Sequence, residues 1–488
     1  MTETSKWQRL ALCGVLLYMG ILLARNMGAY AGGSDSSGYM NFARLLREGA
    51  TTETQRCIEG LRPSDLPGYA YVPLGFVPQD EIRLVPTYPV GLPLLIAGTS
   101  RICGPALAPS LVIWFHGMAG LLLFYGLGRQ AGMGRWWALA GLIILGVGSL
   151  YLSFSVQLMS DMPAMVWALA AVLAAWQARR SAWWSLAAGM AMAVAVLIRP
   201  SNLLLMIPIG VALGLDWRRW LGLVLGGLPG AVLLAAVNQS LYGKAYISGY
   251  GNFWILFSPS CVGPVLMHYI RWLPIVLTPL VVLAPLAPWL CRRELSSAQF
   301  LVLVLWPLSF LSFYAFYPFT SETWWYLRFV LPAFPPLLIL SLLAARRLTR
   351  RFQREHLNWA AFLMLIVCVV WSYKWSHKLY AQGFGKEESM YPESCALLQA
   401  TAPGNAVVLG CQTSGALLYY TRHIIGRLAC MEDGSWERVV AASRSAGRPV
   451  YALLFPFELP ELDKGKIPGH WVKVGAVRQV TLWRLDPP

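Results

Sequence analysis

The chain turns polar soon after its first apolar segment, and that boundary decides how the rest is interpreted. LALCGVLLYMGILLA (Leu10–Ala24) is followed by GGSDSSGYMNFARLLREG (Gly32–Gly49). From Tyr39 to Leu46 the apolar residues recur at i, i+3, i+4 and i+7, which predicts a helix with one apolar face. Asp35 lies between serines at the N-terminal end of this helix. The pattern indicates polar chemistry at a membrane surface.

The composition is that of a membrane protein. Of 488 residues, 57% are hydrophobic and 13% are charged, whereas soluble proteins average about 45–50% apolar and about 25% charged. The net charge of +16 comes from small cationic clusters between apolar segments. That distribution follows the positive-inside rule and argues against nucleic-acid binding. The nine cysteines include no CxxC pair and no metal-ligand spacing.

Eleven apolar segments are predicted to span the membrane. They cover residues 8–28, 106–127, 136–152, 163–178, 183–198, 202–216, 220–241, 272–290, 297–316, 329–345 and 357–375. Lys6 and Arg9 place the N-terminus in the cytoplasm, and arginine clusters such as Arg218 and Arg219 then fall on the same side. The odd number of spans puts the C-terminus outside, so we expect a multi-pass protein of the inner (plasma) membrane. A cleaved signal peptide is the alternative for the first segment, but the further spans favour an uncleaved helix.

Two domains are expected. Residues 1–375 form a transmembrane domain whose first outside loop, residues 30–105, carries amphipathic helices. Within that loop Thr87–Ser100 is too short for a span and contains two prolines, so we expect it to lie flat on the outer face. Residues 376–488 are predicted to be a small soluble α/β domain on the extracytoplasmic side. Its expected strands are Asn405–Gly410, His423–Ala429, Pro449–Phe455 and Val477–Leu485, with helices at Ser414–Thr421 and Ser435–Gly447.

Two acids are candidates for chemistry. Asp35 has the structural alternative of a helix cap, because Asp is favoured there and meets the helix dipole. Both roles are compatible, since a cap also holds a carboxylate ionised and fixed, as a general base requires. Asp161, in LMSDMPAM, lies at the outer end between two spans. Acids are costly near the bilayer and are therefore functional candidates, although Asp161 could also be a second cap.

Four cations fall on the outer side of the predicted topology: Arg199, Lys244, Arg271 and Arg328. Such residues could bind a phosphate group, and the alternative for each is to reach the lipid headgroups. Arg328 is the strongest candidate, because Glu322 and several aromatic residues crowd the same turn.

These features, in this order, resemble the GT-C superfamily of membrane glycosyltransferases, with protein O-mannosyltransferases and lipid A aminoarabinose transferases as the nearest groups. SDSSGYMNFARLLREG, YPVGLPLLIA, the acid between the third and fourth spans, and YLRFVLPAFPPLL carry the resemblance. It covers about residues 1–375. It implies an enzyme that moves a hexosyl or pentosyl group from a polyprenyl-phosphate donor to a lipid, glycan or protein acceptor on the outer side.

The resemblance also implies roles for the candidate residues. Asp35 would be the catalytic base, Asp161 would contact sugar, acceptor or metal, and Tyr88 would wall the pocket. The cations, Arg328 first, would hold the phosphate across a cleft from Asp35. The family often has Asp-Glu or Asp-x-Asp in the first loop, where this chain has Asp-Ser-Ser. No metal site is therefore assigned, and Asp35 and Asp161 are the candidate ligands if Mg²⁺ or Mn²⁺ is used.

Two other classes of function remain open. A transporter or flippase of a lipid-linked substrate predicts ionisable residues near span midpoints and repeated halves. Here the charges gather at one predicted face, and no internal repeat is visible. A noncatalytic scaffold, whose soluble domain binds a partner, predicts that the acids of the outer loops can be replaced without effect.

Overall fold

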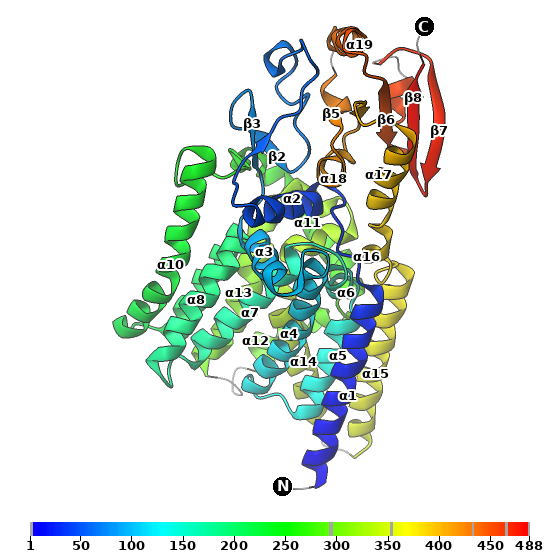
Figure 1. Ribbon diagram of the computed structural model, residues 1–488. Coiled ribbons are helices and arrows are strands. Elements are labelled where there is room, and N and C mark those ends of the chain that lie inside the picture. Colours follow the sequence, from blue (N-terminus) through cyan, green and yellow to red (C-terminus); the bar gives the residue numbers. More distant parts are fainter. Residues whose placement is uncertain (1–2, 292–295, 352–354, 432–433, 464–466, 487–488) are drawn as a thin grey trace. The chain divides into compact units, whose positions relative to one another are not determined.

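The computed structural model describes residues 3–291, 296–351, 355–431, 434–463 and 467–486. The chain divides into two compact units (Figure 1). The membrane unit consists of Met1–Met27, Ser110–Leu233 and Asn252–Phe384. The α/β unit consists of Gly28–Pro109, Leu234–Gly251 and Gly385–Pro488.

The membrane unit is helical. Its α-helices are α1 (Glu3–Asn26), α4 (Ala108–Gln130), α5 (Arg135–Val147), α6 (Ser149–Ser155), α7 (Asp161–Gln177), α8 (Ala182–Ile198), α9 (Met206–Leu213), α10 (Trp217–Tyr242), α11 (Val262–Val276), α12 (Ala287–Leu290), α13 (Ser297–Ala315), α14 (Phe334–Arg351) and α15 (Glu355–Lys378). Short 3₁₀ helices connect them: η2 (Pro200–Leu205), η3 (Phe253–Leu256), η4 (Pro259–Cys261), η5 (Pro279–Leu286), η6 (Pro318–Ser321) and η7 (Trp324–Ala333). α5 packs against both α1 and α15 (Figure 1).

Six helical segments among the described residues are long and apolar enough to cross a membrane, or eight if each of two bent pairs is one span. The polytopic helical class is therefore confirmed, whereas the predicted count of eleven is not. The predicted span 272–290 bends by 120° at Pro279, and the predicted span 136–152 bends by 64° near Gly148. The predicted segments 183–198 and 202–216 correspond to the helices Ala182–Ile198 and Pro200–Leu213, which are separated at Pro200 and are both shorter than 18 residues.

Burial separates inner from outer helices in this unit. In the apolar window of Trp324–Thr349, 94% of residues are buried, against 11% for Trp217–Tyr242. Large side chains such as Trp306, Phe310 and Phe334 fill the core around the inner helix. The outer helix exposes leucines and valines, as expected for a surface in contact with lipid tails.

The α/β unit contains two sheets and several helices. Strands β1 (Glu53–Thr54), β3 (Arg83–Pro86) and β2 (Phe76–Pro78) form a small antiparallel sheet. The larger sheet has the order β5-β4-β6-β8-β7, with β4 parallel to β5 and β6, and β8 antiparallel to β6 and β7. Its strands are β4 (Val407–Leu409), β5 (Ile424–Gly426), β6 (Val450–Leu454), β7 (Trp471–Val477) and β8 (Val480–Leu485). Figure 1 shows β6, β8 and β7 as neighbouring arrows.

The helices of this unit are α2 (Ser34–Arg47), α3 (Gly91–Cys103), α16 (Phe384–Glu387), α17 (Met390–Thr401), α18 (Ser414–Tyr420), α19 (Ser435–Ser445) and α20 (Pro460–Asp463), with 3₁₀ helices η1 (Pro63–Asp65) and η8 (Leu428–Cys430). The four predicted strands and both predicted helices of residues 405–485 are present. The hairpin strand β7 was not predicted separately, and its ladder with β8 is irregular between Lys473 and Gly475.

The first loop and the C-terminal segment share two apolar cores. In one core, Leu45 and Phe76 of the loop pack with Leu398, Val408 and Leu453. In the other, loop residues from Ile58 to Tyr71 pack with β4, β6 and α19. Since burial of apolar surface is the main stabilising contribution to folding, the loop and the C-terminal segment stabilise each other.

Candidate active site

Asp35 occupies the first turn of α2. Gly33 is the N-cap, with extended backbone angles, and the Ser37 amide and hydroxyl both donate to the Gly33 carbonyl, at 3.0 and 2.7 Å. Asp35 is thus inside the helix rather than its cap, next to backbone N–H groups that have no partner within the helix. The positive end of the helix dipole favours its ionised form. The side chain is partly exposed and so remains accessible.

Tyr88 is a hydrogen-bond partner of this turn. Its hydroxyl lies 2.7 Å from the Ser34 hydroxyl and is also hydrogen-bonded to Asp35. Its ring packs against Tyr39, with ring centres 5.0 Å apart, and a Cβ at Gly38 would lie 2.4 Å from that ring. Burial, then the charge of Asp35, holds the pKa of Tyr88 well above its ordinary value. The phenol therefore stays neutral and donates to the carboxylate.

Glu388 is a second acid at the same turn. It lies between α16 and α17, and its carboxylate accepts hydrogen bonds from the Gly33 N–H and from the Ser36 hydroxyl, the latter at 3.4 Å. Burial raises the pKa of Glu388 to about 7, with a smaller contribution from the charge of Asp35, while both hydrogen bonds act in the opposite direction. Sequence reasoning missed it, because KEES (Lys386–Ser389) is typical of a solvated linker.

The membrane unit holds an acid of a different kind. Asp161 begins α7 and is 1% exposed, and two arginines contact it. Arg199, the C-cap of α8, donates to Asp161 Oδ1. Arg328, in η7 and 8% exposed, has Nη1 3.7 Å from Asp161 Oδ2. The predicted candidates Asp161, Arg199 and Arg328 are therefore brought together as one cluster with an excess of one positive charge.

The surroundings fix this cluster. The guanidinium carbons of Arg199 and Arg328 lie 5.4 and 5.2 Å from the centre of the Phe329 ring, a cation–π arrangement. Buried Asn202 donates to the carbonyls of Ala164 in α7 and Ala195 in α8, at 3.3 and 3.0 Å. Asn202 thus ties the helix that carries Asp161 to the helix that ends at Arg199. Two cations held around one buried anion could exchange part of that pairing for a phosphate.

The other predicted residues are not part of either cluster. Lys244 is exposed in the α/β unit, with Nζ 6.0 Å from the centre of the Tyr246 ring. Arg271 is exposed in the membrane unit, with its guanidinium carbon 5.3 Å from the centre of the Trp272 ring. Glu322 is exposed at the end of η6. Such cations over aromatic rings are typical of residues that reach an interface.

Asp35 and Arg328 belong to different units, so their predicted juxtaposition stays a prediction. The same holds for the two acids as joint metal ligands. In the part of the chain that the structure describes, no three His, Cys, Asp or Glu side chains are grouped so that they could hold a metal.

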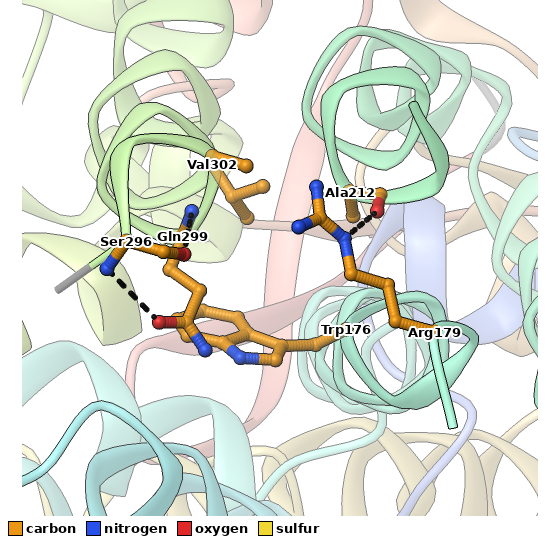
Figure 2. Close-up of a pocket in the computed structure, with 7 residues that line it drawn as sticks. Trp176, Arg179, Ala212, Ser296, Gln299 and Val302 are labelled. Carbon is orange, nitrogen blue, oxygen red and sulfur yellow. Dashed lines mark hydrogen bonds between the residues drawn. The ribbon is translucent and has the colours of Figure 1, made fainter. Parts of the chain in front are cut away.

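A small pocket in the membrane unit lies among α7, α9 and α13 (Figure 2). Its lining includes Trp176, Arg179 and Gln299, and Arg179 Nε donates to the Ala212 carbonyl at 3.3 Å. It offers about 40 Å³ to the centres of water molecules, room for a few waters and too little for a sugar. None of the predicted site residues lines it.

Comparisons with known proteins place the fold. No family model matches the chain, and no curated protein matches it in sequence. Among solved structures, ArnT from Cupriavidus metallidurans is similar over its whole length. The form bound to undecaprenyl phosphate has a TM-score of 0.59 at 15% identity and covers 99% of this chain and 100% of that one. The apo form has a TM-score of 0.61 at 14% identity, with 100% of both chains covered.

An archaeal oligosaccharyltransferase, from Archaeoglobus fulgidus, has a TM-score of 0.56 at 10% identity and covers 91% of this chain and 68% of that one. The predicted resemblance to GT-C glycosyltransferases is therefore confirmed at the level of the fold. The chain is a multi-pass membrane protein with the GT-C fold.

Proposed function

We propose that this protein is an integral membrane glycosyltransferase. It moves a hexosyl or pentosyl group from a polyprenyl-phosphate donor to a lipid, glycan or protein acceptor on the extracytoplasmic face. The observation that carries the proposal is the geometry of Asp35: a partly exposed carboxylate fixed at a helix N-terminus, with a phenol donor beside it. The undecaprenyl phosphate bound to ArnT, whose fold this chain shares, supports a polyprenyl-phosphate donor.

In the proposed reaction an acceptor hydroxyl oxygen attacks the anomeric carbon of the sugar. The bond between that carbon and the phosphate oxygen breaks, and polyprenyl phosphate leaves with the bonding electrons. Asp35 takes the proton of the hydroxyl. General-base assistance of this kind contributes about 10²–10⁴ in rate. Tyr88 keeps the carboxylate oriented by donating to it.

Arg199 and Arg328 are proposed to bind the phosphate that leaves. Guanidinium groups match phosphate oxygens in two-point hydrogen bonds, and stabilising charge that develops on a leaving group is often the largest catalytic contribution. In this proposal Asp161 holds the arginines in place when the site is empty. Lys244, Arg271 and Glu322 are left as residues of the outer surface.

The proposal keeps the predicted arrangement in the plasma membrane. The N-terminus is cytoplasmic, residues 1–375 form the transmembrane domain with an outside loop at residues 30–105, and residues 376–488 form the extracytoplasmic domain. Reporter fusions after Ala381 should be extracytoplasmic, and fusions near Arg347 should be cytoplasmic. The reverse result would remove the extracytoplasmic acceptor from the proposal.

The decisive experiment uses the full-length protein in detergent or lipid vesicles. It is incubated with a panel of polyprenyl-phosphate sugars and a membrane extract, and donor consumption is followed by mass spectrometry. The wild type should consume at least one donor, Asp35→Asn should not, and Glu81→Gln, an exposed acid of the same loop, should match the wild type. No consumption of any donor by the wild type would favour a transporter or a scaffold.

A further inference from the structure

We propose that Glu388 is a positioning residue for Asp35, holding the turn that presents the catalytic carboxylate and placing a second negative charge beside it. This inference rests on the proposed function, because it assigns Asp35 the role of base. Glu388 comes from the C-terminal segment and Asp35 from the first loop. The C-terminal segment would thus set the orientation of the base in the first loop.

The contacts at the turn support the positioning role. Glu388 accepts the Gly33 N–H and the Ser36 hydroxyl, while the Ser36 hydroxyl oxygen accepts the Gly32 N–H at 3.2 Å. A Cβ on Gly32 would lie 1.7 Å from Glu388 Oε2, so the carboxylate rests directly against the backbone there. These bonds fix both residues that precede α2, and Asp35 follows two residues after Gly33.

A rigid frame surrounds this contact. Gln412 Nε2 donates to the Tyr391 hydroxyl at 3.2 Å, and a Cβ on Gly33 would lie 2.8 Å from that nitrogen and 3.3 Å from that hydroxyl. Glu458, 5% exposed, accepts the N–H groups of Cys411 and Gln412 at 2.8 and 3.0 Å. Cys411 and Gln412 follow the carboxyl end of β4, the middle one of three parallel strands. Open α/β sheets usually bind ligands beyond that edge, and here the turn before α2 packs there.

The titratable groups around Glu388 come from several elements. Asp35 faces it from α2, Tyr391 from α17, and Glu458 acts on Tyr391 from the loop after β6. Arg478, at the turn between β7 and β8, pairs with Glu387, Nη1 to Oε2 at 3.2 Å, and its Nη2 donates to Ser389 at 2.8 Å. Burial raises the pKa of Glu388 to about 7, so the second negative charge beside Asp35 is present above that pH.

The test compares Glu388→Gln, Glu388→Ala and the matched control Glu393→Gln, an exposed acid of α17. Kinetics of sugar transfer are measured from pH 5.5 to 8.5 beside Asp35→Asn. Glu388→Gln keeps an acceptor oxygen for the turn, so its kcat at high pH should fall only about 3–10-fold. Its pH profile should also lack the rise in rate near pH 7 that we expect of the wild type. Glu388→Ala should lose about 10²-fold in kcat with a small change in KM, because the base is misplaced. Wild-type rates and pH profiles in both Glu388 variants would overturn the inference.

A second readout does not depend on turnover. Hydrogen exchange followed by mass spectrometry should show faster exchange of the amides of residues 31–37 in Glu388→Ala at unchanged melting temperature, and no change in Glu393→Gln. Unchanged exchange in that peptide overturns the positioning role, even if the enzyme is active. Faster exchange with no donor consumed by the wild type would leave the contact established and defeat the proposed function instead.

Discussion

Asp161 and Asp35 are the two acids with proposed roles, and they differ in their neighbours and in their exposure. Asp161 is enclosed by two arginines and is closed to solvent. Asp35 has a phenol and a second carboxylate as neighbours and remains partly exposed. The two arginines contact both carboxylate oxygens of Asp161. The proposed function accordingly gives the task of accepting a proton to the accessible Asp35 and the task of organising the arginines to the enclosed Asp161.

The largest effect is expected from breaking the cluster around Asp161. Arg328→Ala leaves a buried carboxylate with one partner fewer and should cost about 3–5 kcal/mol in the free energy of unfolding. Thermal unfolding of the purified protein measures it. The double variant Arg328→Ala with Asp161→Asn should recover part of the loss, because the buried charge is gone as well. Equal stability of Arg328→Ala and the wild type would show that the arginine does not support Asp161.

Binding of undecaprenyl phosphate should affect the melting temperatures of Asp161→Asn and the wild type differently. Asp161→Asn leaves two arginines without their carboxylate and should lower the melting temperature. Undecaprenyl phosphate should restore much of that loss, because a ligand that binds only the folded state stabilises it, and it should stabilise the wild type less. Undecaprenol, which lacks the phosphate, is the control. Equal effects of both lipids would contradict the phosphate role of Arg199 and Arg328.

Removing the phenol beside Asp35 should have an intermediate effect. Tyr88→Phe keeps the ring packed on Tyr39 and loses the hydrogen bonds to Ser34 and Asp35. Hydrogen bonds to charged groups are worth about 1.5–3 kcal/mol, so kcat should fall about 10-fold or more. Tyr250→Phe, on the ring that packs edge-on against Tyr88, is the matched control and should change kcat little.

The raised pKa of Glu388 also predicts a pH dependence of stability. The folded pKa of Glu388, about 7, lies above its ordinary value of 4.5, so the folded state binds the proton more tightly than the unfolded state. Its contribution is therefore most favourable below about pH 4.5 and is lost as the pH rises to 7, by at most about 1.4 kcal/mol per pH unit. In Glu388→Gln this decrease in the melting temperature between pH 5 and 7 should be absent. An identical slope in both proteins would contradict a Glu388 that titrates near pH 7 in the folded state.

The smallest effect is expected at the exposed cations. Lys244→Ala and Arg271→Ala should change stability by less than about 0.5 kcal/mol, because both side chains lie over aromatic rings at the surface. Donor KM should change less than in Arg328→Ala. A larger KM effect at either residue would move the phosphate site toward it.

Local patterns predicted much of this molecule. Apolar periodicity identified α2, the strands β4, β5 and β6, and most of the long helices. Asp35, Asp161, Arg199 and Arg328 were predicted as candidates because ionisable residues at the ends of apolar segments are unusual. The predicted number of spans is not confirmed, since several of the predicted segments are helices shorter than 18 residues or bend at a break such as the one before Pro279.

Contacts between residues far apart in the chain could not be predicted from the sequence. Asp161 and Arg199 are 38 positions apart and Arg328 is farther still, so no local pattern links them. Glu388 reaches the Ser36 hydroxyl across 352 positions, from a segment that has the composition of a linker. The shared cores of the first loop and the C-terminal segment are hidden for the same reason.

The most direct test of the account measures chemistry and donor binding separately in Asp35→Asn and Asp161→Asn. Single-turnover transfer gives the rate, and binding of labelled undecaprenyl phosphate gives the affinity. We expect Asp35→Asn to lower the transfer rate by about 10²–10⁴ at unchanged affinity for undecaprenyl phosphate. Asp161→Asn should change that affinity more than it changes the rate. Transfer by Asp35→Asn at the wild-type rate would contradict the account.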